Sequence, residues 1–214
     1  RRLLERRGWP VSEVMVIGDR ANLDDELAFA YDAHHLRYLA GLKAQGKTHR
    51  EQLLAAPEAH FRAHPLGQER GRHGHWGIPC QLVFEHEGRQ VTHKGLVMLS
   101  GPMRHALRQD RAKHLRALRQ ELAALQAKIG RPWYRSVATV QQRADTVIRQ
   151  SSVGRFMRAQ AETEASGQVR LRWWLDRYTL WQAMQKDGRY LLATNDWSLS
   201  PQRMFDLYRQ KDGV

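Results

Sequence analysis

The stretch from Val14 to Asp19, four apolar residues followed by Gly and a carboxylate, constrains the fold of this chain most strongly. Because no polar residue interrupts the apolar run, it predicts a short strand that is buried on both faces. Gly18 permits a sharp turn, so that Asp19 stands at the carboxyl end of the strand. Ligands and metal ions bind at that end of the strands in α/β sheets, which makes Asp19 a candidate metal ligand. The alternative is that Asp19 is only a turn or capping residue.

The residues after Asp19 predict a helix and then a second strand. Asn22 is expected to cap the helix, and three consecutive acids at positions 24 to 26 suit its positive N-terminus better than an active site. Leu36 to Leu42 predicts the next strand. Strand, helix and strand together indicate an α/β unit.

The charge of the chain indicates a polyanionic partner. Its 35 Lys and Arg exceed its 22 Asp and Glu, giving a net charge of +13, and nucleic acid is expected as the partner before an anionic membrane. No run approaches the roughly 18 apolar residues that a membrane-spanning helix needs. The single cysteine, Cys80, excludes an intramolecular disulfide and is compatible with a reducing cytoplasm. The chain does not begin with Met, which suggests a piece of a longer protein.

Two β-type runs, Cys80 to Phe84 and Gln90 to Leu99, predict a β-hairpin at about 80–99 that turns at Glu87 and Gly88. Histidines surround this hairpin at positions 60, 64, 73, 75, 86 and 93. A zinc site of Cys80 and two of these histidines is conceivable, but their spacings match no compact finger pattern. Histidines that face solvent or DNA are therefore the favoured interpretation, ahead of a zinc site.

A basic helical hairpin is predicted at about 103–150. Its apolar residues step by three and four, as in a coiled-coil seam, at Leu115, Leu118, Leu122, Leu125 and Ile129. Gly130 and Pro132 end the first helix, and a second helix is expected to pack back on it. Between positions 103 and 129 there are seven Arg and Lys and two acids, a net charge of +5. A solvated face would mix the two signs more evenly, so contact with phosphates is the favoured interpretation.

An Arg- and Trp-rich strand is predicted at about 168–175, where Arg170 and Arg172 alternate with apolar residues. Trp173 and Trp174 are adjacent and must point to opposite faces of such a strand, so one belongs to the core and the other is free to stack on a base. After it, a turn at Asp187 and Gly188 leads into a further strand.

Three separated segments resemble the DDE-type transposases of bacterial insertion sequences: residues 16–20, residues 187–195, and residues 200–214 with Tyr208-Arg209-Gln210-Lys211. The resemblance is closest to the branch with a long insertion between the second Asp and the Glu. It implies an α/β fold, an RNase H-like catalytic core interrupted by a long mixed β-hairpin and helical-hairpin insertion. Residues 1–43 and 186–214 would be parts of the core, and residues 44–185 the insertion.

The resemblance also implies a catalytic site. Asp19 is the second of three carboxylates that hold two Mg²⁺ ions, the first Asp lies upstream of Arg1, and the Glu falls one position past Val214. The chain alone is therefore expected neither to cut nor to join DNA. Such ions activate a water or a 3′-hydroxyl and neutralise the leaving oxygen.

The resemblance further implies that a helix Tyr and a basic residue three positions later contact the transposon end. These are Tyr208 and Lys211, and Lys would hold a phosphate as a point charge. The remaining DNA-binding candidates are Arg209, Arg20, Arg170, Arg172 and Trp174. The expected partner is double-stranded DNA, at transposon ends and target, with a homodimer as the active complex. A cytoplasmic, nucleoid-associated location follows.

Two other interpretations stay open. A non-catalytic basic nucleic-acid-binding protein, with Asp19 as a turn residue and the helical hairpin as an oligomerisation element, explains the charge and the heptads. A different RNase H-like nuclease, such as a resolvase, would keep Asp19 as a metal ligand without requiring Tyr208 and Lys211.

Overall fold

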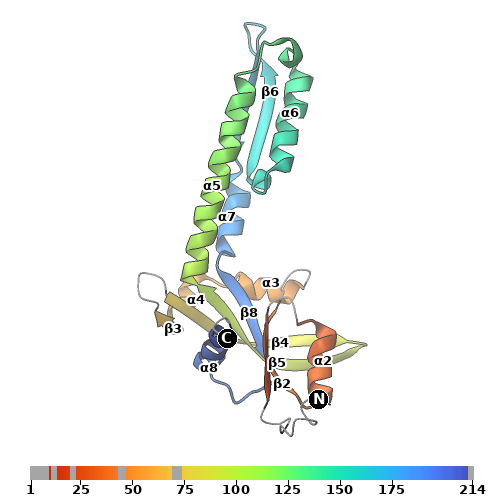
Figure 1. Cartoon of the computed structure of the whole chain (residues 1–214), viewed down its shortest axis with the longest axis vertical. Coiled ribbons are helices and arrows are strands. Elements are labelled where there is room, and N and C mark those ends of the chain that lie inside the picture. Colours follow the sequence, from red (N-terminus) through yellow and green to blue (C-terminus); the bar gives the residue numbers. More distant parts are fainter. Residues whose placement is uncertain (1–9, 11–13, 20–22, 43–46, 69–73, 212–214) are drawn as a thin grey trace. The chain divides into compact units, whose positions relative to one another are not determined.

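The computed structural model describes residues 10, 14–19, 23–42, 47–68 and 74–211, which fold into two compact units. Unit 1 comprises residues 1–104 and 188–214, and unit 2 comprises residues 105–187. The chain is mixed α/β, with a six-stranded mixed sheet and, within the described ranges, seven α-helices (Figure 1). Among those helices, none combines the length and the apolar character needed to cross a membrane.

The large sheet of unit 1 brings together strands from both ends of the chain. Its strands β1 and β2 are parallel, and every other neighbouring pair is antiparallel. The order across the sheet is β1 (Met15–Gly18), β2 (Arg37–Leu42), β8 (Arg189–Thr194), β5 (Arg89–Ser100), β4 (Gly74–His86) and β3 (Pro65–Gln68).

The predicted α/β unit is present, with two local differences. Helix α2 (Asp25–Ala33) connects β1 to β2. The cap is Asp24 rather than Asn22, because the Asp24 Oδ1 accepts a 2.8 Å hydrogen bond from the Leu27 N–H; Asn22 lies outside the described residues. Strand β1 was expected to be buried on both faces and is only partly buried, since it lies at the edge of the sheet with β2 as its sole described neighbour.

The central strands of the sheet bury apolar side chains on both faces. On β2, the side chains of Tyr38 and Ala40 belong to one core cluster, and that of Leu39 to the other, as the period of two in a strand requires. The first cluster includes residues of α2, α3 (Thr48–Leu54) and α4 (Glu58–Arg62). The second cluster includes residues of α8 (Pro201–Gln210), the helix that carries the candidate site.

The predicted hairpin is present and longer than expected, since β4 and β5 run from Gly74 to Ser100. The backbone at Glu87 and Gly88 adopts the left-handed region (φ 49° and 72°), which is the conformation that a tight two-residue hairpin turn requires. Strand β5 pairs with β8, so the hairpin extends the sheet of unit 1. The second compact unit begins at residue 105, within the range 44–185 of the proposed insertion.

Unit 2 contains the two predicted helices and a β-hairpin that share one core. Helix α5 (Gly101–Gln126), whose first four residues belong to unit 1, and helix α6 (Val137–Gln150) are joined by the 3₁₀-helix at Pro132–Tyr134. The predicted seam is confirmed, with Leu118, Leu122 and Leu125 buried. The seam does not form a coiled coil between the helices alone, because the apolar face of β6 (Met157–Thr163) and β7 (Val169–Leu175) joins the same core. Helix α7 (Arg177–Gln185) follows β7.

The end of unit 2 is held by an ion pair. The buried carboxylate of Asp187 accepts two hydrogen bonds from Arg111 of α5, at 2.8 and 2.5 Å, and one at 3.4 Å from Arg108. The next residue, Gly188, has φ +72°, and a Cβ there would lie 2.5 Å from the carbonyl oxygen of Ser100. Only glycine fits this predicted turn.

Candidate functional site

The structure brings Asp19, Tyr208 and Lys211 together at one edge of unit 1. The Tyr208 hydroxyl and the Lys211 ammonium each donate to the Oδ1 of Asp19, both at 3.3 Å. Asp19 directly follows β1, whereas Tyr208 lies in α8, 189 positions later in the sequence. The three residues that the sequence analysis selected from two distant segments are therefore neighbours.

Local sequence and packing position the helix side of this site. The Ser200 hydroxyl accepts a 3.1 Å hydrogen bond from the Arg203 N–H and caps α8, and Pro201 occupies the first turn, where its missing N–H costs nothing. Met204 and Tyr208 are one turn apart and face the sheet, which leaves Tyr208 only 6% exposed. Tyr208 is thereby held with its hydroxyl at the end of β1.

Lys211, the residue that follows α8, is covered more than its acidic partner. Its ammonium lies 4.7 Å from the centre of the Tyr208 ring, a cation–π contact. The Lys211 side chain is 17% exposed and that of Asp19 is 65% exposed. The Asp19 carboxylate is therefore the more exposed member of this pair.

The carboxylate of Asp19 is one oxygen donor group of the kind that Mg²⁺ prefers. In the part of the chain that the structure describes, no group of three or more His, Cys, Asp or Glu is arranged to hold a metal ion. Asp19 therefore fits the role of one ligand in a shared site. The residues described do not form a complete metal site.

The other candidate residues lie elsewhere. The Arg209 guanidinium lies over the Phe205 ring, 5.4 Å from its centre, on the same helix as Tyr208. Arg20 lies outside the described residues. Arg170, Arg172 and Trp174 belong to strand β7 of unit 2, which is a compact unit distinct from the one that holds Asp19.

The face of the β6–β7 hairpin that carries these residues is polar and partly neutralised. Arg170 pairs with Glu164 at 2.9 Å and Arg172 with Glu162 at 2.8 Å. As predicted for adjacent residues of a strand, Trp173 packs against the core of unit 2, whereas Trp174 is 49% exposed. This face borders a cavity of about 570 Å³, lined by Gln126 and residues 170–174.

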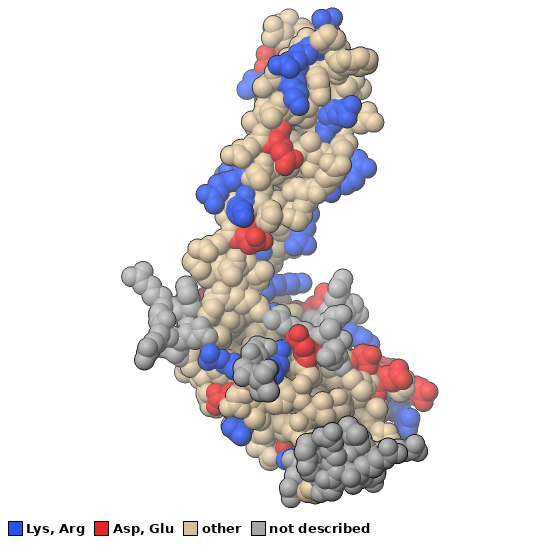
Figure 2. Space-filling model, viewed as in Figure 1, with Lys and Arg blue, Asp and Glu red and all other residues tan. Residues whose placement is uncertain are grey.

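Unit 2 holds most of the excess positive charge. It contains sixteen Lys and Arg and seven Asp and Glu, so it contributes +9 of the net +13. Figure 2 shows Lys and Arg side chains spread over this unit with few acids between them on the face in view. Sequence analysis missed its exposed aromatic rings, Trp133, Tyr178 and Trp181, of which the last two stack at 6.4 Å. Tyr178 and Trp181 lie three positions apart on α7, and this spacing was the available signal for that pair.

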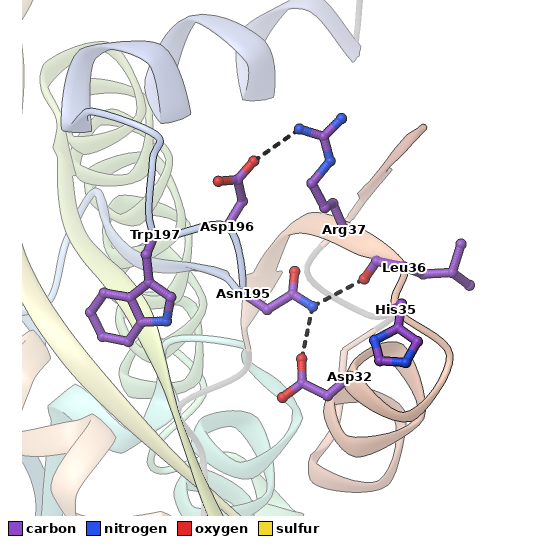
Figure 3. A pocket seen from close by; sticks show the side chains of 7 residues that line it. All are labelled: Asp32, His35, Leu36, Arg37, Asn195, Asp196 and Trp197. Atoms are coloured by element: carbon purple, nitrogen blue, oxygen red, sulfur yellow. Dashed lines mark hydrogen bonds and ion pairs between the residues drawn. The ribbon is translucent and has the colours of Figure 1, made fainter. Parts of the chain in front are cut away.

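The sequence did not predict a second polar site in unit 1. A pocket of about 460 Å³ is lined by Asp32, His35, Leu36, Arg37, Asn195, Asp196 and Trp197 (Figure 3). It lies where β2 begins and β8 ends. Because Met15 pairs with Arg37 and Gly18 with Ala40, this is the end of β1 and β2 opposite to Asp19. The signal was two polar residues, Asn195 and Asp196, directly after a buried strand, the same kind of pattern that selected Asp19.

A chain of hydrogen bonds connects Asp32, at one side of this pocket, to the buried Tyr38. The Tyr38 hydroxyl lies 2.6 Å from the His93 Nδ1, and the His93 Nε2 lies 2.7 Å from the Asp32 Oδ2. Tyr38 is fully buried, and burial together with the charge of Asp32 raises the pKa of its hydroxyl. The Asn195 amide donates to the Asp32 Oδ1 at 2.8 Å and to the Leu36 carbonyl at 3.0 Å. Both oxygens of Asp32 are therefore held in place.

The opposite side of the pocket contains a second carboxylate. Asp196 accepts hydrogen bonds from the N–H and the hydroxyl of Ser198 and lies 3.3 Å from the Arg37 guanidinium. Burial raises the pKa of this carboxyl, but the contacts with Ser198 and Arg37 outweigh it and lower the pKa below its ordinary value. Asp196 is therefore ionised at neutral pH.

Comparisons with models of protein families, with curated proteins and with solved structures found no match to this chain.

Proposed function

We propose that this chain is part of a DDE-type transposase of a bacterial insertion sequence, with Asp19 as one of the carboxylates of an RNase H-like core. The observation that carries the proposal is the meeting of Asp19 with Tyr208 and Lys211. The resemblance assigns these residues to one catalytic region, although they lie on segments at opposite ends of the chain. Their hydrogen bonds to a single carboxylate oxygen agree with that assignment.

The position of Asp19 in the sheet supports the same proposal. It follows β1, which is parallel to β2 and connected to it by α2. Side chains at the carboxyl ends of parallel strands are the usual ligand-binding residues of α/β sheets. In the proposed core, a further strand upstream of Arg1 pairs with β1, which lies at the edge of the described sheet.

The proposed chemistry divides between this chain and residues outside it. Asp19 would hold Mg²⁺ together with two carboxylates from beyond the 214 residues, and the metal would supply an activated oxygen nucleophile and neutralise the leaving oxygen. Tyr208 orients Asp19 through its hydroxyl. Lys211 exchanges its contact with Asp19 for a phosphate oxygen of the bound DNA, as a point charge.

The proposal gives unit 2 the role of holding DNA. Its net charge of +9 suits the phosphate backbone, and contacts of that kind supply affinity without reading sequence. Trp174 offers an exposed ring for stacking beside Arg170 and Arg172. The partner is double-stranded DNA, and the active complex is a homodimer that works in the cytoplasm.

One observation favours a second candidate function. The ion pair between Lys211 and Asp19 partly neutralises the carboxylate without a metal, as a structural contact would. A non-catalytic basic DNA-binding protein explains this pair and the charge of unit 2 equally well. The two functions differ in whether removing the charge of Asp19 affects DNA cleavage.

The deciding experiment uses the full-length protein that contains this chain and DNA carrying the ends of its own element. Asp19→Asn keeps the size of the side chain and removes a metal ligand. We expect strand cleavage to fall by more than about 100-fold, because residues that merely orient metal ligands already cost 10–100-fold when mutated. DNA binding should persist, as measured by fluorescence anisotropy.

The matched control is Asp24→Asn, since Asn caps a helix as well as Asp does. This variant should cleave at the rate of the unmodified protein. If Asp19→Asn also cleaves at that rate, Asp19 is not a catalytic ligand and the non-catalytic function takes its place.

A further inference from the structure

We propose that the pocket between Asp32 and Trp197, called here the Asp32 pocket, binds a guanine nucleotide, either free or as an unpaired residue of a DNA strand. The pocket lies at the end of β1 and β2 opposite to Asp19, so the inference does not depend on the proposed catalytic site. Its volume of about 460 Å³ falls within the range of small-molecule sites.

The charges of the pocket select the class of ligand. A simple anion would meet the carboxylates of Asp32 and Asp196, and a simple cation would meet the Arg37 guanidinium (Figure 3). A nucleotide avoids both conflicts, because its base presents neutral N–H donors and its phosphate is a separate negative group. Arg37 is 41% exposed and keeps N–H groups beyond the one that contacts Asp196.

Asp32 is built as a fixed acceptor. Its two oxygens are already oriented, one by the Asn195 amide and the other by His93, which is itself buried against Tyr38. Each carboxylate oxygen has two lone pairs and can accept again, and the Asp32 side chain is 37% exposed. Because the carboxylate is oriented before the ligand arrives, little conformational entropy is lost on binding.

Guanine matches this acceptor better than adenine does. Its Watson–Crick edge carries two adjacent donors, N1–H and the 2-amino group, which suit the two oxygens of one carboxylate. Adenine presents an acceptor at N1, which a carboxylate repels. The exposed indole of Trp197, 51% accessible, supplies a flat surface on which a base can stack.

The experiment is a displacement titration with the 214-residue chain, using N-methylanthraniloyl-GMP as the fluorescent probe. We expect GMP to displace the probe at a concentration at least about tenfold lower than AMP. Guanosine should bind more weakly than GMP, because it lacks the phosphate that Arg37 contacts. Equal displacement by GMP and AMP, or no binding of the probe, would overturn the proposal.

Two substitutions test the assigned contacts. Trp197→Ala should weaken the binding of GMP roughly tenfold or more. Trp133→Ala, which removes a ring that is 82% exposed in unit 2, should leave the affinity for GMP unchanged. Asp32→Asn should weaken the binding of GMP and strengthen the binding of XMP, since xanthine carries a carbonyl where guanine has its 2-amino group. This exchange of preference keeps the test decisive, because a misfolded variant would lose both ligands. An effect of Trp133→Ala equal to that of Trp197→Ala would refute the site.

Two thymidine oligonucleotides distinguish a free nucleotide from an unpaired base of DNA. One carries a central guanine and the other a central adenine. Stronger displacement by the guanine strand than by GMP identifies an unpaired base of single-stranded DNA. Displacement by GMP at the lower concentration identifies a free nucleotide. Failure of both, with Asp19→Asn still abolishing cleavage in the full-length protein, would remove this inference and leave the proposed function standing.

Discussion

Units 1 and 2 cover their β-sheets differently, and the difference determines where polar chemistry can occur. The sheet of unit 1 has apolar clusters on both faces, so its carboxylates Asp19 and Asp32 lie at the ends of the sheet. The two-stranded sheet of unit 2 is packed on one face only. Its other face is free to carry Arg170, Arg172 and Trp174. A doubly covered sheet thus confines polar chemistry to the ends of its strands, whereas a singly covered sheet offers an exposed face.

The two units also differ in how their charges are used. In unit 1, buried or half-buried pairs hold helices in place, such as Asp25 with Arg50 at 2.6 Å and Glu58 with Arg104 at 2.7 Å. In unit 2 the most buried pair is Arg111 with Asp187, and the unit carries a net charge of +9. In the proposed function, unit 1 therefore supplies the site and unit 2 most of the DNA affinity.

The largest expected effect comes from removing the buried carboxylate of Asp187 in unit 2. Asp187→Ala leaves the charge of Arg111, whose side chain is 14% exposed, without its bidentate partner. Removing one partner of a buried pair typically costs about 3–5 kcal/mol. Urea denaturation followed by circular dichroism should show this loss of unfolding free energy.

The matched control for Asp187→Ala is Asp145→Ala on α6, where the carboxylate is exposed and accepts one hydrogen bond from Gln141. It should change the unfolding free energy by less than about 0.5 kcal/mol. Equal effects of the two substitutions would mean that unit 2 does not depend on its buried pair and would remove this contrast between the units.

A pH-dependent effect should test the ion pair between Asp25 and Arg50 in unit 1. Burial raises the pKa of the Asp25 carboxyl, but hydrogen bonds and charges of Lys47 and Arg50 outweigh it, so the pKa lies below its ordinary 3.8. Because the folded-state pKa is depressed, the ionised group stabilises the fold above the ordinary value. That contribution is lost as the pH falls through the folded-state pKa, below 3.8.

Denaturation between pH 6 and pH 2.5 measures this dependence. Asp25→Asn should flatten the decline in stability at the acidic end, whereas Glu26→Gln, at an exposed neighbour on α2, should leave it unchanged. A curve for Asp25→Asn that superimposes on that of the unmodified chain would show that the pair with Arg50 does not stabilise unit 1.

The smallest expected effect concerns DNA affinity. Arg170→Ala removes one phosphate-binding candidate from unit 2, and the slope of log K against log salt concentration should become shallower by about 0.9. Arg89→Ala, at the exposed end of the β4–β5 hairpin in unit 1, should leave the slope unchanged. Anisotropy titrations of double-stranded DNA at several salt concentrations measure both slopes. A larger change for Arg89→Ala would place the main DNA contacts in unit 1.

Local patterns in the sequence were sufficient for most individual elements. The three- and four-residue steps of leucine predicted the apolar face of α5, and the Asp187-Gly188 turn marked the start of β8. The alternation around Trp173 and Trp174 predicted which positions of β7 face the core and which face solvent. These features depend on backbone geometry and on neighbours a few residues away, and the sequence records both.

Only the tertiary structure decided which distant segments meet. No local pattern states that β8 pairs with both β2 and β5, yet this order places the β4–β5 hairpin in the sheet of unit 1. The same order makes β1 an edge strand, which is why its apolar run is only partly buried. Which strands pair depends on how much apolar surface the whole folded chain buries, and every segment contributes to that total.

The two candidate sites of unit 1 show the same limit. A family resemblance grouped Asp19 with Tyr208 and Lys211, and their actual contact depends on α8 packing against the sheet. Nothing in the sequence joined Asp32 to His93, 61 positions away, because neither residue belongs to a recognised motif. Sequence alone thus determined the elements and their polar ends. The fold determined which of those ends share a site, since hydrogen bonds between distant side chains form only after strand order has brought them within reach.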